Sequence, residues 1–135
     1  MKVKCIHKPG SKVPDEILAL GNTPGTVFNV TWDRVYIVYA MCIWQGVLHY
    51  LILNDENHRP DWYPSGLFQV GDSRLPSNWH FGFLGGKPGW SLQPIWGYAE
   101  LVLDGGQHYL ALIEREPEAL DVFEKRSASA TGDPA

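Results

Sequence analysis

The strongest hydrophobic pattern in the chain is the stretch VYIVYAMCIWQGVLHYLIL, residues 35–53, which contains no charged residue. Its length approaches the ~20 residues that a helix needs to cross a bilayer. However, β-branched and aromatic residues dominate it, Gln45 and Gly46 interrupt it, and His49 lies in its second half. The pattern therefore favours a β-hairpin over a membrane helix. Because both faces of the first strand are apolar, we expect that strand to be buried on both sides within a barrel.

Shorter patterns on both sides of the hairpin predict further strands. KVKCIH near the N-terminus alternates with a period of two, and residues 26–31 fit a second strand. Strong turn formers occupy residues 55–60. After them, DWYP predicts a short strand that Pro64 stops, SGLF predicts a single turn, and FQV predicts another short strand. A short turn-like or helical piece is expected over residues 15–20.

The second half of the chain has a different pattern. Residues 71–97 are rich in glycine and proline and predict loops. The stretch YAELVLDGGQHYLALIERE, residues 98–116, predicts two strands around a central DGG, although residues 110–116 fit a helix equally well. PEALDVFEKR, residues 117–126, predicts a helix, because proline suits the first turn and the acidic and basic residues suit the two ends.

Within this helix, Leu120 and Phe123 are three residues apart and should share one face that packs against the rest of the domain. The final stretch SASATGDPA, residues 127–135, predicts a disordered tail. Residues 1–126 are then a single globular domain of a mostly β (α+β) fold. We expect an SH3-like barrel or a strongly bent antiparallel sheet over about residues 26–70, followed by a short C-terminal helix.

Composition and charge narrow the possible partners. A chain of 135 residues with 44% hydrophobic content has the composition of one folded domain. Its net charge of −4 argues against a nucleic-acid binder, which needs a cationic face. Residues 98–124 contain seven acidic residues against the single base Arg115, whereas residues 1–12 contain four lysines and no acid. A basic protein is therefore a more plausible partner than a polyanion.

The cysteines and the N-terminus indicate a reducing compartment. Cys5 and Cys42 have no CxxC spacing, so two reduced thiols are favoured, with a disulfide left open. The start MKVKCIHKPG lacks the apolar run of a secretory signal. We therefore expect a cytoplasmic protein without a membrane segment.

Two stretches resemble a known group of proteins. The first is HYLILNDENHRPDWYPSGLFQVGDSRLPSNW, residues 49–79. Its order of elements is the one seen in SH3-like barrels: a long strand, an acidic turn, an aromatic pair, a proline and a one-turn LF unit. The stretch is similar to small bacterial proteins with a YLI.DD…WYP..LF.V.D…P..W pattern, some of which are immunity proteins encoded beside polymorphic or contact-dependent toxins. HYLALIEREPEALDVFEKR, residues 108–126, is similar to the L.ER.PEAL..F close of the same group. The resemblance implies an SH3-like barrel and an immunity function, but assigns no binding residue by position.

The motifs of common catalytic and metal sites are missing from the sequence. No two of the five histidines have the spacing that would bring two metal ligands together on a strand or helix. The glycine-rich GFLGGKPGW lacks the first glycine and the Ser or Thr of a phosphate-binding loop. His49, Asp61 and His80 are an acid–base set only if the fold brings them together, and a satisfied structural histidine is favoured at position 49. No catalytic residue, metal or cofactor is predicted.

The resulting prediction is a monomeric, non-enzymatic immunity protein that masks the basic active surface of a cognate toxin domain. Alternation along the strand places Trp62 and Tyr63 on opposite faces, so at most one of them is exposed to a partner. The predicted partner-binding residues are acidic or aromatic: Asp55, Glu56, Asp61, Trp62, Asp72, Trp79, Glu100 and Asp104.

The alternative is a small enzyme or ligand-binding barrel whose pocket is lined by Trp and His. Histidines and carboxylates that converge in a deep pocket would favour this alternative, because small-molecule sites are concave with a few polar groups. A flat acidic face with exposed aromatic residues would favour protein binding.

Overall fold

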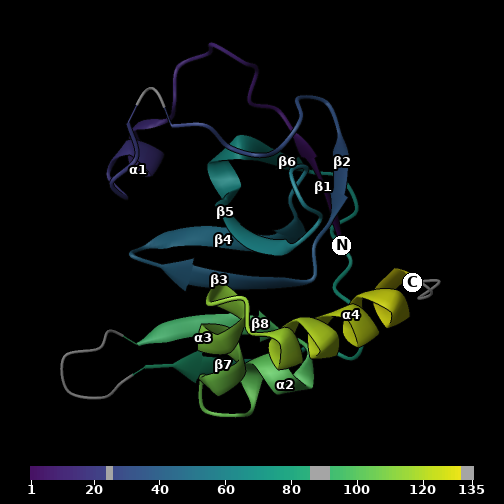
Figure 1. Ribbon diagram of the computed structural model, residues 1–135. Helices are drawn as coiled ribbons and strands as arrows, with labels where there is room; N and C mark the ends of the chain where they lie inside the picture. The colour runs from purple at the N-terminus through teal and green to yellow at the C-terminus, as the bar shows by residue number, and fades with distance from the viewer. Residues whose placement is uncertain (24–25, 86–91, 132–135) are drawn as a thin grey trace.

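The computed structural model describes residues 1–23, 26–85 and 92–131, which form two antiparallel sheets and a layer of helices (Figure 1). The smaller sheet packs on one face of the larger sheet, and the helices near the C-terminus pack on the other. The fold is therefore α+β with more strand than helix, as predicted. The described residues contain no closed barrel.

The small sheet has the order β2–β1–β6, with β1 (Lys2–Cys5) between β2 (Val35–Ile37) and β6 (Phe68–Val70). Residues of β1 alternate between exposed and buried, so the lysines face solvent while Val3 and Cys5 enter the core. This alternation is the one that KVKCIH predicted.

The large sheet has the order β5–β4–β3–β8–β7. Its strands are β3 (Ala40–Trp44), β4 (Val47–Leu53), β5 (Pro60–Pro64), β7 (His80–Leu84) and β8 (Gln93–Gly97). Gln45 and Gly46, which join β3 to β4, both have positive φ angles, of 50° and 77°. Two-residue hairpin turns require this geometry. The predicted hairpin is confirmed, although its first strand is shorter than expected.

That first strand is divided because the chain changes sheets at Val38 and Tyr39. The N–H of Val38 donates to the carbonyl of Met1, in the small-sheet region, and the N–H of Tyr39 donates to the carbonyl of Leu51 in β4. The sequence stays apolar where the chain passes from one sheet to the other, because residues before and after this point are buried in the two hydrophobic cores. The sequence predicted that this strand is buried on both faces within a barrel. In the structure, its burial results from the packing of the large sheet between the small sheet and the helices.

The helical elements are α1 (Asp15–Leu18), the 3-10 turn η1 (Ser65–Leu67), α2 (Ala99–Val102), α3 (Gln107–Ile113) and α4 (Pro117–Thr131). The predicted helix at residues 117–126 is confirmed within α4. Its Phe123 is buried and lies edge-on against Tyr39, with ring centroids 5.1 Å apart, and Leu120 packs against the same core. Among the described residues, no helix has the length and apolar character needed to cross a bilayer.

Four predictions of local structure differ from the structure. Residues 26–31 form no strand. Residues 98–116 form the helices α2 and α3 instead of two strands, so the alternative of a helix at residues 110–116 is confirmed as far as Ile113. Residues 71–97 include β7 and β8, although their central part, 86–91, lies outside the described residues. The expected tail is helical as far as Thr131, and only residues 132–135 lie outside the described part.

These errors have physical causes. A Cβ atom on Gly82 would lie 3.0 Å from Val102, so this glycine allows α2 to pack against β7 and is not a loop signal. Gly105 and Gly106 do break the chain, with φ angles of 77° and 94°, but they separate two helices. The helix α4 continues through alanine-containing sequence beyond residue 126, because alanine has the highest helix propensity.

Candidate functional site

A cavity of about 300 Å³ lies between the large sheet and α3. Strands β3, β4 and β5 form one wall, and α3, which lies beside β3 in Figure 1, forms the other. The cavity is lined by Cys42, Trp44, His49, Pro60, Asp61, Trp62, Tyr109, Leu112 and Ile113. Its size is at the lower end of the range for small-ligand sites.

Burial decreases from the floor of this cavity to its rim. Cys42, His49 and Leu112 are nearly inaccessible to solvent, whereas Trp44 is 40% exposed and Ile113 is 50% exposed. The site therefore has an apolar, aromatic mouth and a histidine near its floor.

His49 has a defined protonation state. Its Nδ1 lies 2.8 Å from the carbonyl oxygen of Val47, and because a carbonyl only accepts, Nδ1 must carry the proton. Burial lowers the pKa of His49, although the hydrogen bond to Val47 raises it in part. The ring is therefore neutral near pH 7, and Nε2 has a free lone pair. The ring of Trp44 stands edge-on to it at 5.8 Å.

Cys42 lies directly opposite His49 in the β3–β4 pairing, but the two do not form a nucleophile–base pair. Burial raises the pKa of the Cys42 thiol to about 12, so it stays protonated at neutral pH. A thiol in this state is a poor nucleophile. The described residues also contain no group of three His, Cys, Asp or Glu side chains that could hold a metal ion.

Asp61 joins the sheet to the helical layer at the side of the cavity. Its Oδ1 accepts a hydrogen bond from Nη2 of Arg115 at 2.7 Å, and its Oδ2 accepts one from Nδ2 of Asn54 at 2.5 Å. The side chain of Asp61 is 31% exposed. Next to it, the ring of Trp62 contacts that of Tyr109, with centroids 5.7 Å apart.

Two enclosed nitrogen atoms near this site have no hydrogen-bond partner: Nε1 of Trp62 and Nη1 of Arg115. Both are donors, and neither has access to solvent. A ligand in the cavity would therefore not reach them without a movement of the wall.

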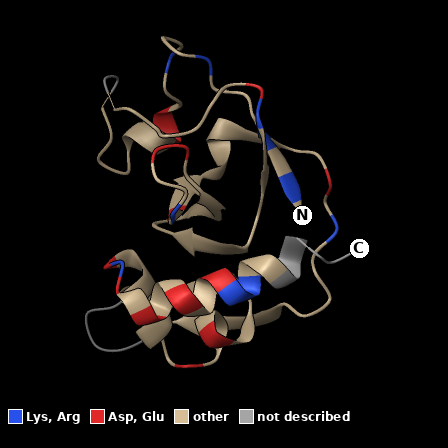
Figure 2. Ribbon diagram, turned by 45° about the vertical axis from the view of Figure 1, so that its right-hand side comes forward, with Lys and Arg blue, Asp and Glu red and all other residues tan. Residues whose placement is uncertain are grey.

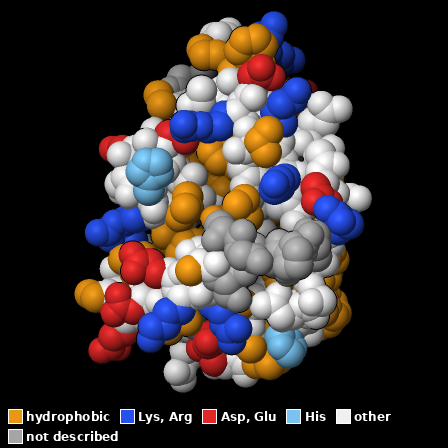
Figure 3. Space-filling model, turned by 90° about the vertical axis from the view of Figure 1, so that its right-hand side faces the viewer, with side chains coloured by type: hydrophobic (Ala, Val, Ile, Leu, Met, Phe, Trp, Pro, Cys, Tyr) orange, Lys and Arg blue, Asp and Glu red, His pale blue; other side chains and the backbone are white. Residues whose placement is uncertain are grey.

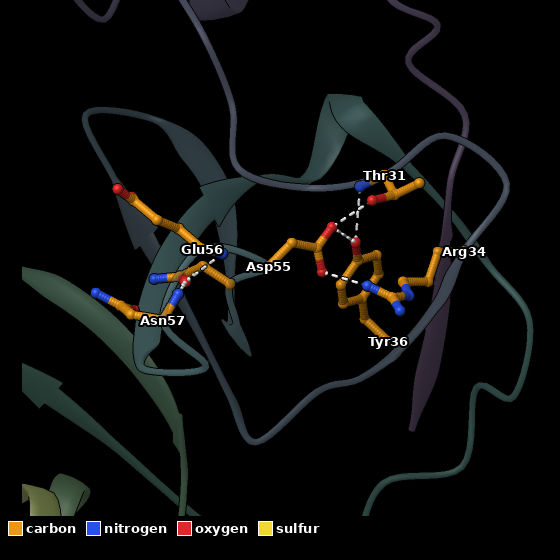
Figure 4. A network of polar contacts seen from close by, with 7 residues as sticks. Thr31, Arg34, Tyr36, Asp55, Glu56 and Asn57 are labelled. Carbon is orange, nitrogen blue, oxygen red and sulfur yellow. Dashed lines mark hydrogen bonds and ion pairs between the residues drawn. The ribbon is translucent and has the colours of Figure 1, made fainter.

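Asp55, which the sequence assigned to partner binding, has a structural role (Figure 4). Its carboxylate accepts hydrogen bonds from Thr31 Oγ1 at 2.5 Å, from Tyr36 Oη at 2.7 Å and from Arg34 Nη1 at 2.8 Å. Partial burial alone would raise the pKa of Asp55, but these three donors outweigh it and hold the pKa below its ordinary value. The carboxylate fixes the loop before β2 to the turn between β4 and β5.

Three other predicted acids also have internal partners. Asp72 pairs with Arg74 at 2.9 Å, and the hydrogen bonds from Arg74 lower its pKa. Glu100 pairs with Arg126 at 2.6 Å, which lowers the pKa of Glu100 in the same way. Asp104 accepts hydrogen bonds from the backbone N–H groups of Gly106 and His108 at the start of α3.

The remaining predicted residues are spread over the molecule. Glu56 accepts a hydrogen bond from Asn29 at 3.0 Å in an exposed turn. Trp79 lies half-buried beside Phe123 and Arg126, away from the cavity. Trp62 faces the helical layer and Tyr63 faces the small sheet, so the predicted alternation is confirmed. Only Asp61 and Trp62 of the eight predicted residues line the cavity. His80, the third member of the acid–base set, is exposed on β7 outside it.

A further group of exposed carboxylates lies outside the eight residues that the sequence assigned to partner binding. The acidic segment, residues 114–124, contributes five exposed side chains, and within the described part of the chain none of them forms a hydrogen bond or ion pair. They are Glu114, Glu116, Glu118, Asp121 and Glu124. Red bands recur along α4 in Figure 2, and acidic side chains gather at the lower left of the face seen in Figure 3, with basic ones between them. The acidic excess over residues 98–124 was the available signal.

Comparison with known proteins gives no relative: no family model, curated protein or solved structure matches the chain. The features of the molecule that bear on function are therefore the cavity, the acidic segment and the internal pairing of the other carboxylates.

Proposed function

We propose that this chain is a non-enzymatic binding protein of the toxin-immunity type, which neutralises a basic protein domain by covering its active surface. The observation that carries the proposal is the acidic segment, whose five exposed carboxylates have no internal cation in the described residues. Exposed charge of one sign raises the rate of encounter with an oppositely charged partner and discriminates against wrong partners.

The distribution of charge supports this orientation. Lys2, Lys4, Lys8 and Lys12 belong to the N-terminal part, and β1 is marked by blue in Figure 2 at a distance from the red bands of α4. A basic partner is therefore attracted more strongly to the helical layer than to the N-terminal part, where Lys4 pairs with Asp33 and Lys12 pairs with Asp15. Asp61 and Trp62 stay in the proposed interface, because they line the cavity beside the acidic segment.

We also propose that residues 1–70 are an SH3-like unit, as the resemblance implies. Three features support it: β1 pairs with both β2 and β6, the β2–β3 run bends from one sheet into the other, and a 3-10 turn connects β5 to β6. In this interpretation, β7, β8 and the helices are an addition to the free side of β3.

The test is a titration against the toxin domain encoded beside the gene, with association rates measured at about 50 and 300 mM NaCl. The neutral triple variant Glu114→Gln, Asp121→Asn and Glu124→Gln should bind at least about tenfold more slowly at low salt. Asp15→Asn, Glu16→Gln and Asp33→Asn are the matched control, with the same change in net charge on the N-terminal part, and should bind like wild type. No complex at micromolar concentration, or equal effects of both triples, would refute the proposal.

A second candidate, a protein that binds a free small molecule, is favoured by the cavity itself, which combines Trp, His and carboxylate groups as that alternative required. Filling the mouth by Ile113→Trp would then abolish binding of the small molecule without unfolding the protein, because Ile113 is half exposed. If instead this variant weakens only the association with the basic partner, the first candidate is supported.

A further inference from the structure

We propose that the cavity is a receptor for an alkylammonium group, and that in the complex a lysine side chain of the basic partner fills it. This inference rests on the proposed function, but its first part can be tested on the isolated protein. A lysine bound in the cavity would fix the orientation of the partner, which long-range attraction between charges does not determine.

The walls have the chemistry that an organic cation requires. Trp44, Trp62 and Tyr109 line the cavity from β3, β5 and α3. Aromatic faces attract ammonium groups within ~6 Å of the ring centroid, and the attraction increases when the cation leaves water. A cavity of about 300 Å³ has room for a four-carbon chain with its ammonium head.

Two polar groups in the lining of the cavity, Asp61 and His49, are acceptors. Each carboxylate oxygen of Asp61 receives one donor, from Arg115 or from Asn54, and therefore keeps a second lone pair. Nε2 of His49 is unprotonated, because Nδ1 donates to the backbone. The unpartnered donors around the site are enclosed. A ligand that donates hydrogen bonds is therefore matched to Asp61 and His49.

Charge near the mouth favours a cation as well. The positive charge of Arg115 is paired with Asp61, and two acids without internal partners, Glu114 and Glu116, flank Arg115 in the chain. These carboxylates disfavour an anion and favour an ammonium group in this region of the chain, because like charges repel and opposite charges attract.

The cavity combines apolar lining residues with hydrogen-bond acceptors, and this combination matches the apolar stem and the charged head of lysine. Pro60, Leu112 and Ile113 give the apolar lining that a four-carbon stem can contact, while Asp61 and His49 supply the acceptors for its head. Lysine buries its stem against apolar surface in this way and carries three donors on a compact head. Arginine carries five donors in a planar fork, which is more than the free acceptor sites of Asp61 and His49.

The experiment is a calorimetric titration of the purified protein with n-butylammonium chloride, and with n-butanol as the uncharged match. We expect about millimolar binding of the amine and at least about tenfold weaker binding of the alcohol. Trp44→Leu should weaken amine binding about tenfold or more, and Asp61→Asn should weaken it as well. Trp32→Leu is the control, because Trp32 is similarly exposed, at 47%, but lies outside the cavity. Circular dichroism verifies that each variant is folded.

The outcomes separate this inference from the proposed function. Equal binding of amine and alcohol, or unchanged amine binding in folded Trp44→Leu, overturns the cation site even if the basic partner still binds. Amine binding without any complex with the toxin domain supports the site and contradicts the proposed function. If Trp44→Leu removes amine binding but leaves the affinity for the toxin domain unchanged, the lysine of the partner does not enter the cavity, and that part of the inference is wrong.

Discussion

The turn at Asp55 and the acidic segment at residues 114–124 contain the same kind of side chain in opposite situations. Asp55 has three internal donors and a side chain that is only 21% exposed, so its charge is used within the fold. The five acids of the segment have no such donors in the described chain and face solvent. A carboxylate in an acidic stretch is thus available to a partner only where the fold provides no cation or hydroxyl for it.

The acids of the segment have a fixed geometry only if the helical layer packs firmly on the large sheet. Phe123→Ala tests this packing and should have the largest effect on stability. Phe123 is buried and contacts Tyr39 and Tyr98 edge-on, so its removal leaves a large cavity. We expect a loss on the order of 3 kcal/mol in urea melts. A loss below about 0.5 kcal/mol would mean that α4 is peripheral and that its acids have no fixed geometry.

Asp55→Asn should have the next largest effect. Asparagine keeps the shape of the side chain but loses the charge that receives Arg34, and it replaces one acceptor oxygen by a donor facing Thr31 or Tyr36. We expect a loss of about 2 kcal/mol in the same melts. Glu56→Gln is the matched control in the same turn, since Glu56 is exposed with one neutral donor, and should change stability by less than about 0.5 kcal/mol. Equal losses for the two variants would contradict the structural role of Asp55.

The contribution of Asp55 should also depend on pH. Its pKa in the folded protein is below the ordinary value of 3.8, so the charged form is favoured by folding. The stabilisation is therefore complete above the unfolded pKa and is lost as the pH falls through the folded pKa. The difference in unfolding free energy between wild type and Asp55→Asn should be constant from pH 7 to about pH 5 and should shrink towards pH 3. A difference that stays constant down to pH 3 would show that the charge is not what stabilises the turn.

The smallest effect on stability should come from the acidic segment. The neutral triple variant at Glu114, Asp121 and Glu124 removes exposed charges without internal partners in the described residues. We expect its free energy of unfolding to stay within about 0.5 kcal/mol of wild type, although the same variant slows association with a basic partner. A larger loss of stability would show that these acids, like Asp55, stabilise the fold.

The sequence predicted those parts of the fold in which local pattern and tertiary environment agree. The β3–β4 hairpin, the β5–η1–β6 unit and α4 have such patterns, and each is present. β7 and β8 were missed, because Gly82 and Gly97 resemble loop residues, although each is needed where a neighbouring side chain packs closely against the strand. The helix α2 was missed, and α3 was left open against a strand, because their short apolar stretches fit a strand as well as a helix.

The candidate site was less predictable than the fold. Asp55 is bonded to residues 19 to 24 positions away in the chain, and no local pattern in the sequence indicates that they meet. The cavity likewise combines side chains of three strands with those of α3. A Trp- and His-lined pocket was expected only as an alternative, because the spacing of these residues does not show that they converge.

The position of β1 between β2 and β6 has a bearing on the order in which the chain folds. β3, β4 and β5 meet through short connections, whereas β1 pairs with β6, whose residues follow it by more than sixty positions. Contacts between distant residues form slowly, because a long loop must be closed first. We therefore expect β1 to dock after β3, β4 and β5 have paired. Until it arrives, β2 and β6 lack their common neighbour, and the inner face of the small sheet lacks Val3 and Cys5. During synthesis β1 leaves the ribosome before β6 but must wait for residue 70 before it finds its place.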